Sequence, residues 1–102
     1  MNATTETYII PRLRQYFKSQ PIDKAWMFGS FSRGEETPES DLDIIVSFKD
    51  GQPIGLLRYA RIYGELKELT GREIDLVEEG TLMPFALNAA EADKILIYER
   101  EN

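Results

Sequence analysis

The most informative part of this sequence is FGSFSRG at residues 28–34, which is soon followed by SDLDIIV at residues 40–46. The second stretch is rich in Ile and Val and is expected to form a β-strand. Side chains alternate between the two faces of a strand, so Asp41 and Asp43 share one face, and their hydrophobic neighbours occupy the other. The pattern therefore predicts two carboxylates on one face of an otherwise apolar strand.

Two carboxylates on one strand face repel each other unless a cation lies between them. A pair of divalent ions meets this need, because both aspartates can bridge metals about 4 Å apart in a phosphoryl-transfer site. The structural alternative is that Asp41 and Asp43 are solvated residues of a turn or cap. An EF-hand calcium loop fits poorly, because its Gly and its terminal Glu do not follow at the required spacing.

The first stretch is interpreted as the end of a strand that feeds one helical turn at residues 30–34. Gly29 permits a close approach of the backbone, and the N–H groups at a helix start attract an anion. Ser30 adds a hydroxyl, and Arg33 is placed to reach a phosphate oxygen. An ordinary strand-to-loop turn is the alternative for Gly29 and Ser30. The sequence matches neither the Walker A loop nor the dinucleotide-binding fingerprint.

A third acidic candidate lies in EIDLV at residues 73–77. Asp75 alternates with two hydrophobic neighbours and therefore points away from them. If this strand lies beside the one that carries Asp41 and Asp43, Asp75 completes a set of three carboxylates near an attacking hydroxyl. Glu73 lies on the same face and competes for this role. The structural alternative for Asp75 is a solvated strand residue.

Composition narrows the chemistry that this chain can perform. The 102 residues are 42% hydrophobic and 29% charged, which is typical of a single globular domain over residues 1–102. Cys and His are both absent, which excludes disulfides, a Cys nucleophile, a Cys/His zinc site and a Ser-His-Asp triad. A catalytic metal would need oxygen ligands, and this favours Mg²⁺ or Mn²⁺ over Zn²⁺.

The net charge of −6 argues against general nucleic-acid binding, which needs clustered Lys and Arg. It does not exclude a nucleotide that is bound through metal ions. No secretory signal pattern opens the chain, and no apolar run approaches a bilayer span of about 20 residues. We therefore expect a soluble, cytoplasmic protein without a membrane partner.

Hydrophobic periodicity predicts an α/β (α+β) domain with helices packed on a small mixed sheet of three to four strands. A helix is predicted over residues 4–19, capped by Thr4 or Thr5, with Pro11 either kinking it or opening a shorter helix. The other predicted elements are, in order, strand 22–28 in a central position, strand 41–48, helix 55–70 closed by Gly71, strand 73–77, helix 82–92 and a short segment, 95–98, that is strand or helix.

The combination of these features resembles the minimal nucleotidyltransferase (MNT) group of the DNA-polymerase-β-type nucleotidyltransferase superfamily. The resemblance covers residues 28–46, and the chain fits the minimal core in length and in the order of its elements. It rests on Gly29-Ser30, Arg33-Gly34, Ser40-Asp41-x-Asp43 and the later strand with Asp75. Ser32 is a small departure, because the group often has Ala there.

The resemblance implies that a nucleoside monophosphate is transferred from a nucleoside triphosphate to an acceptor hydroxyl, with release of pyrophosphate. It assigns two Mg²⁺ ions to Asp41, Asp43 and Asp75. It also assigns the triphosphate tail of the substrate, expected to be ATP, to Gly29, Ser30 and Arg33.

MNT proteins are often paired with a small helical HEPN toxin, and some act as the antitoxin by transferring AMP to a tyrosine of that toxin. This function is the expectation for the present chain, and the HEPN partner is implied by the resemblance alone. Two alternatives stay open: an antitoxin that neutralises its partner by contact, and nucleotidyl transfer to a small molecule or an RNA end. A homo-oligomer is compatible with the sequence.

Overall fold

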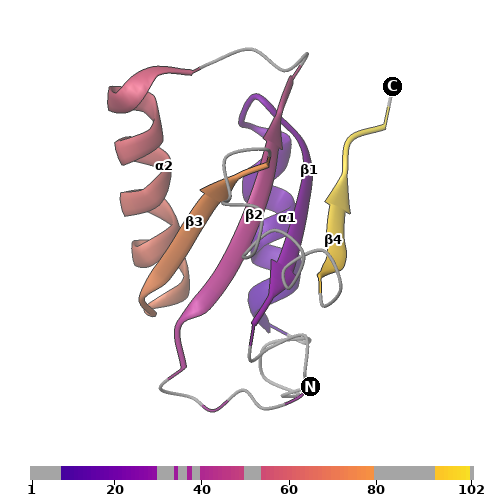
Figure 1. Ribbon diagram of the computed structural model, residues 1–102, viewed down its shortest axis with the longest axis vertical. Helices are drawn as coiled ribbons and strands as arrows, with labels where there is room; N and C mark the ends of the chain where they lie inside the picture. The colour runs from indigo at the N-terminus through magenta and orange to yellow at the C-terminus, as the bar shows by residue number, and fades with distance from the viewer. Residues whose placement is uncertain are drawn as a thin grey trace.

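A four-stranded mixed sheet forms the centre of this protein (Figure 1). A computed structural model describes residues 8–29, 34, 37, 40–49, 54–79 and 94–101. The strand order is β3-β2-β1-β4, with β1 antiparallel to both of its neighbours and β2 parallel to β3. The elements along the chain are α1 (Ile10–Lys18), β1 (Ile22–Phe28), β2 (Leu42–Phe48), α2 (Gly55–Thr70), β3 (Ile74–Glu78) and β4 (Ile95–Glu99). The α/β fold class and the central place of strand 22–28 are thereby confirmed.

Helix α1 is shorter than the helix predicted over residues 4–19. It starts at Ile10, with Pro11 in its first turn. Proline is favoured there because its missing N–H has no partner to lose at a helix start and its φ is already helical. The shorter of the two alternatives is therefore correct. The suggested caps, Thr4 and Thr5, lie outside the described residues.

Helix α2 connects the two parallel strands β2 and β3. It spans the predicted residues, Gly55–Thr70, and Gly71 closes it in the left-handed conformation with φ 67°. The Gly71 N–H donates to the Lys67 carbonyl at 2.8 Å, which satisfies one of the last carbonyls of the helix. A crossover of this kind is what parallel strands require, so α2 brings the start of β3 beside the start of β2.

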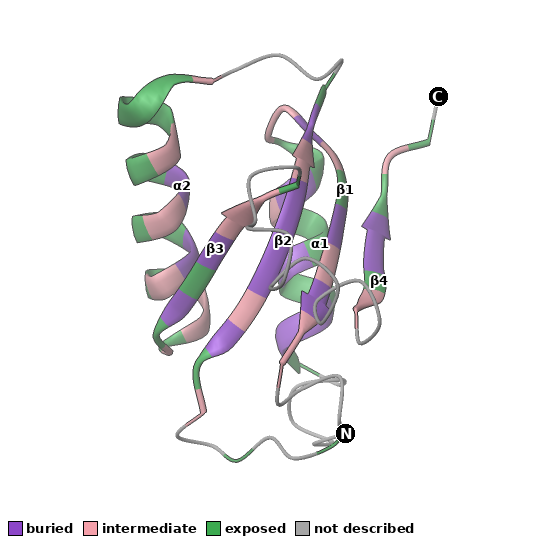
Figure 2. Ribbon diagram, in the orientation of Figure 1, coloured by how far each residue is buried: buried purple, intermediate pink, exposed green. Residues whose placement is uncertain are grey.

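The hydrophobic core lies between one face of the sheet and both helices. Figure 2 shows buried residues on α1, on α2 and along the strands, including a continuous buried stretch in the middle of β2. On β2 the core residues are Leu42, Ile44, Val46 and Phe48, and the helices add Leu13, Phe17, Ile62 and Leu66. Because side chains alternate along a strand, the residues between them, Asp43 above all, point to the opposite face.

The last described segment settles one choice that the sequence left open. Residues 95–98 belong to β4, which pairs with β1. The strand is irregular, because the register shifts between Leu96 and Tyr98, and the consecutive residues Ile97 and Tyr98 are both buried. Only the neighbouring β1 decides this, because a run of four apolar residues suits a strand or a helix equally. The predicted turn at 30–34 and the predicted helix at 82–92 lie outside the described residues, apart from Gly34.

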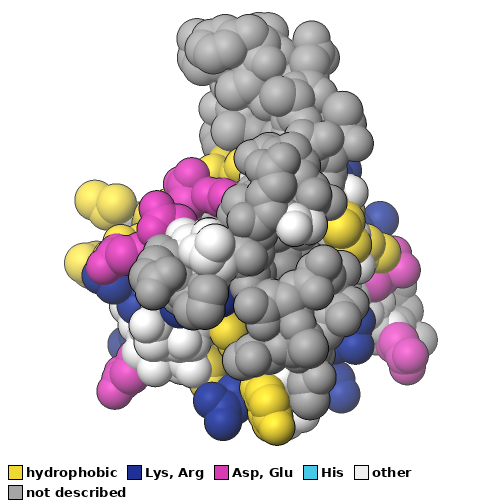
Figure 3. Space-filling view, turned by 90° about the horizontal axis from the view of Figure 1, so that it is seen from below, with side chains coloured by type: hydrophobic (Ala, Val, Ile, Leu, Met, Phe, Trp, Pro, Cys, Tyr) yellow, Lys and Arg dark blue, Asp and Glu magenta, His cyan; other side chains and the backbone are white. Residues whose placement is uncertain are grey.

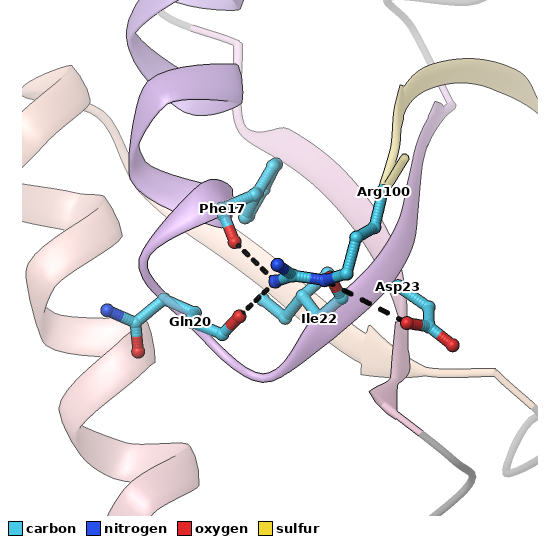
Figure 4. A network of polar contacts seen from close by, with 5 residues as sticks. All are labelled: Phe17, Gln20, Ile22, Asp23 and Arg100. Atoms are coloured by element: carbon cyan, nitrogen blue, oxygen red, sulfur yellow. Dashed lines mark hydrogen bonds and ion pairs between the residues drawn. The ribbon is translucent and has the colours of Figure 1, made fainter. Parts of the chain in front are cut away.

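Arg100 fastens the end of β4 to the connection between α1 and β1 (Figure 4). Its Nη2 donates to the carbonyls of Phe17 and Gln20, and its Nε donates to the carbonyl of Ile22. Asp23 Oδ1 lies 3.9 Å from the same Nε. A planar guanidinium carries several donors in fixed directions, which suits this group of carbonyls.

In the part of the chain that the structure describes, no helix has the length and apolar character to cross a membrane.

Tyr16 connects the two helices and makes the free energy of unfolding depend on pH in the alkaline range. The Tyr16 hydroxyl of α1 donates to Glu65 Oε1 of α2 at 3.0 Å. Burial, and then the hydrogen bond to Glu65, raise the pKa of Tyr16 above its ordinary value of 10.0. A raised folded-state pKa adds stability that is present below about pH 10 and is lost as pH rises further.

We expect the free energy of unfolding to fall between about pH 8 and about pH 11, and to fall less in Tyr16→Phe. Urea titrations at the two pH values measure both changes. Equal losses in the wild type and in Tyr16→Phe would show that Tyr16 is not responsible.

Candidate active site

Two aspartates stand side by side on the sheet face that points away from the helices. Asp43 of β2 and Asp75 of β3 are register partners in the parallel pair. Partners on adjacent strands lie about 4.8 Å apart and on the same face. Asp75 is exposed and Asp43 is half-buried. The structure therefore brings Asp75 beside Asp43, as the sequence predicts, although the strands are separated by the whole of α2.

The backbone bend at the end of β1 lies against the Asp43 carboxylate. Phe28 is the β1 partner of Asp43, and Gly29 follows it with a φ of 70°. A Cβ atom added to Gly29 would stand 2.1 Å from Asp43 Oδ2. The left-handed φ and the close approach each demand glycine here. The structure places the Asp43 carboxylate against this glycine, and the predicted contact of Gly29 with a phosphate stays a prediction.

Asp41 lies just outside the strand pairing. It is exposed and immediately precedes β2, whose first residue, Leu42, donates its N–H to the Glu73 carbonyl at 2.9 Å. Among the residues that the structure describes, no group of three or more acidic side chains is arranged to hold one metal ion. Strand pairing aligns Asp43 with Asp75, but no ladder contact fixes the direction of Asp41. Of the three carboxylates that were predicted to converge, strand pairing places Asp43 and Asp75 side by side, and Asp41 lies outside this pairing.

The phosphate-binding half of the predicted site is described only at its two glycines. Ser30 and Arg33 lie outside the described residues, and their predicted contacts with a triphosphate remain predictions. Gly34 is exposed and has a φ of 73°. Such a φ favours glycine, as does that of Gly29. At both positions the backbone adopts a conformation that residues with side chains rarely adopt.

Glu73, the competitor for the role of Asp75, is occupied elsewhere. It precedes β3, and its Oε1 lies 3.2 Å from Nζ of Lys67, near the end of α2. Its backbone carbonyl accepts the Leu42 N–H. Asp75, in contrast, lies inside the strand and directly opposite Asp43. The geometry favours Asp75 as the second carboxylate.

An apolar row adjoins the two aspartates on the same face. Trp26, Ile45 and Val77 are register partners across three strands, two residues along from Phe28, Asp43 and Asp75. Lys94 Nζ lies 4.3 Å from the centre of the Trp26 ring and 3.9 Å from Glu79 Oε2. Figure 3 views the molecule from the end where β2 begins and shows acidic side chains at several places on that surface. The site thus combines carboxylates with a partly apolar floor.

Two residues that support the site were not singled out from the sequence. The Tyr59 hydroxyl of α2 donates to the Leu76 carbonyl of the edge strand β3. Burial, and then the charge of Asp75, raise the pKa of Tyr59, so the phenol stays protonated to a higher pH than an ordinary tyrosine. Arg72 binds the segment that leads into Asp41. In the sequence, Tyr59 is one residue of the helix predicted over residues 55–70, and no motif singles out Tyr59 or Arg72.

The residues present suit a hard divalent cation. Carboxylate oxygens are the ligands that Mg²⁺ and Mn²⁺ prefer, and the chain has no Cys or His to attract a softer metal. A cavity of about 570 Å³ is lined by residues of α1 and β4, including Arg14, Lys18 and Tyr98. It lies at the opposite edge of the sheet from β3 and is separate from this site.

Comparison with known proteins identifies a family whose model matches most of this chain. The model of the nucleotidyltransferase domain family matches residues 9–97. Protein adenylyltransferase MntA of Thermococcus cleftensis is 38% identical over 70 residues, a match that covers 69% of this chain and 66% of MntA. The chain thus aligns with about two thirds of the length of this relative.

Two solved structures share the fold. A crystal structure of a toxin–antitoxin with AMP-PNP superposes with a TM-score of 0.76 at 15% identity and covers 90% of this chain and 74% of the other. The tri-AMPylated HEPN toxin of Shewanella oneidensis in complex with its MNT antitoxin gives a TM-score of 0.65 at 18% identity, over 98% of this chain and 74% of the other. At these identities the likeness extends to the fold alone.

Proposed function

This chain belongs to the nucleotidyltransferase domain family, within its minimal nucleotidyltransferases, and from that premise we propose that it transfers AMP from ATP to a hydroxyl of a partner protein. The observation that carries the proposal is the register pairing of Asp43 with Asp75, beside a bend at Gly29 that admits no side chain. The aspartate pair and the glycine bend support the proposal, because carboxylates held side by side near a close backbone approach suit metal-assisted phosphoryl transfer.

The proposed reaction is an in-line displacement at the α-phosphorus of ATP. The acceptor oxygen forms a bond to that phosphorus, the bond from the phosphorus to the bridging oxygen of the β-phosphate breaks, and pyrophosphate leaves with the electron pair. The proton of the acceptor hydroxyl passes to a carboxylate, for which Asp75 is the candidate because it is exposed and adjoins Asp43. The products are an AMP ester of the acceptor and pyrophosphate.

Three carboxylates, Asp41, Asp43 and Asp75, would hold the divalent ions of this reaction, and Mg²⁺ is the proposed metal. When bound, the ions supply positive charge that offsets the charge developing on the phosphate oxygens. Gly29, Ser30 and Arg33 would bind the triphosphate tail. The protein's own contribution is to hold carboxylates that otherwise repel each other in fixed positions on neighbouring strands.

We propose a HEPN toxin as the acceptor protein, with a tyrosine as the modified residue, and an antitoxin role for this chain. The name of the relative MntA supports a protein as the acceptor and AMP as the transferred group. The fold shared with the MNT antitoxin of the AMPylated HEPN complex supports the choice of partner. A cytoplasmic location accords with such a role.

The experiment that tests the function combines the purified chain with a purified HEPN toxin, the proposed acceptor. We expect label from [α-³²P]ATP, but not from [γ-³²P]ATP, to appear on the HEPN protein in the presence of Mg²⁺ and to be lost with EDTA. Mass spectrometry should place one or more AMP groups on a tyrosine. Neutralisation of the toxin without ATP and without label would overturn the enzyme and favour an antitoxin that acts by contact.

A further inference from the structure

Arg72 connects the turn after α2 to the segment that delivers Asp41. Its Nε and Nη2 donate to the Ser40 carbonyl at 3.1 Å and 2.7 Å, and its Nη2 also donates to the Thr37 carbonyl at 2.8 Å. Arg72 is only partly exposed, and Ser40 lies 32 residues away in sequence. One guanidinium thus ties the entrance of β2 to the entrance of β3.

The segment that Arg72 binds is already a closed turn. The Ser40 N–H donates to the Thr37 carbonyl at 3.0 Å, and the Thr37 N–H donates back to Ser40 Oγ at 2.9 Å. Arg72 adds its donors to the carbonyls of the same two residues. The position of this turn relative to β3 is therefore set by Arg72, which stands outside the turn.

Asp41 lies between two residues whose backbones are held by hydrogen bonds. Before it, Ser40 is bound by Arg72, and after it, Leu42 donates its N–H to the Glu73 carbonyl at 2.9 Å. Both contacts come from consecutive residues of the same short connection, Arg72 and Glu73, which lead into the strand of Asp75. The backbone on either side of Asp41 is thus held to the element that carries the opposing carboxylate.

We infer that Arg72 is a positioning residue that holds Asp41 in place for the divalent ions, an inference that rests on the proposed function. Arginine suits this task because its planar fork is always charged and binds several acceptors in fixed directions. Lysine presents one flexible ammonium and cannot reproduce the three bonds to two carbonyls. In this role Arg72 acts on Asp41 through the backbone of Ser40, to whose carbonyl it donates.

The test uses the full chain with Arg72→Met, Arg72→Lys and the matched control Arg58→Met, which changes an exposed arginine of α2. We expect Mn²⁺ affinity, titrated with a non-hydrolysable ATP analogue, to fall about 10–100-fold in Arg72→Met and less in Arg72→Lys. Amide hydrogen exchange at Ser40 and Leu42 should become at least about tenfold faster, while exchange in the middle of β2 stays unchanged. Arg58→Met should change neither quantity.

A double-mutant cycle separates positioning from a general structural role. If Arg72 acts through Asp41, then Arg72→Met should lower Mn²⁺ affinity little further once Asp41 is already Asn. Additive losses would overturn the inference, as would wild-type affinity and wild-type exchange in Arg72→Met. If Arg72→Met does not fold, Arg72→Lys decides the same points.

The inference and the proposed function fail in different ways. Full transfer activity in both Asp41→Asn and Asp43→Asn would remove the proposed function, whatever the exchange data show. An inactive Asp43→Asn together with an Arg72→Met variant of unchanged Mn²⁺ affinity would leave the function standing and remove the role of Arg72.

Discussion

Replacing Asp43 with Asn is expected to lower AMP transfer roughly a thousandfold, since it removes a carboxylate that would hold the divalent ions, whose positive charge stabilises the transition state. The free energy of unfolding should stay within about 1 kcal/mol of the wild type, because the change also removes repulsion between Asp43 and its register partner Asp75. Rates of label transfer to the acceptor protein and urea titrations of the variant measure the two effects. An inactive variant that remains folded would separate chemistry from stability.

Glu73→Gln is the matched control for this prediction. It removes a carboxylate from the same connection, but one whose contact is an ion pair with Lys67 on the surface. Such a pair contributes little to stability, so both transfer and unfolding should resemble the wild type. Asp75→Asn should behave like Asp43→Asn. If Glu73→Gln were inactive and Asp75→Asn active, the two residues would have to exchange roles.

Gly29→Ala is expected to damage both the fold and the site. The left-handed φ of Gly29 costs an alanine about 1–2 kcal/mol, and the added Cβ would stand 2.1 Å from Asp43 Oδ2. The carboxylate must move to make room, and a displacement on the order of 1 Å costs roughly a hundredfold in rate. Thermal denaturation and the transfer assay should therefore show a loss of stability together with a larger loss of activity.

Gly71→Ala isolates the conformational part of that effect. Gly71 has nearly the same φ, 67°, but a Cβ there meets no atom within 4 Å. The control should lose about 1–2 kcal/mol of stability and retain its activity. If Gly29→Ala and Gly71→Ala lost the same stability and both stayed active, close packing of Gly29 on Asp43 would not matter for function.

Local sequence was sufficient for most of the elements. The helix at residues 55–70 and the strand at 22–28 have the bounds that periodicity and the flanking Gly and Pro residues indicate. These signals are local, because they reflect the faces that a segment buries and the residues at which it must stop. Pro11 and the residues 95–98 each left two alternatives. Pro11 lies where proline is intrinsically favoured, in the first turn of α1, whereas residues 95–98 form a strand because they pair with β1.

The candidate site likewise depends partly on local sequence and partly on contacts between elements. The sequence by itself determined the residue types: two aspartates on one strand, a third after the next helix, a glycine at the end of β1, and the absence of any Cys or His that would draw a softer metal. Alternation along a strand also placed Asp43 opposite the core.

Only the tertiary structure decided which of these residues meet. The parallel register sets Asp75, not Glu73, beside Asp43, and the bend at Gly29 packs on that carboxylate. Arg72 reaches back to Ser40, and Tyr59 reaches the edge of β3. The physical reason is that register and side-chain reach depend on how α2, which connects β2 to β3, packs on the face of the sheet, and this packing is a property of the whole core and of no single segment.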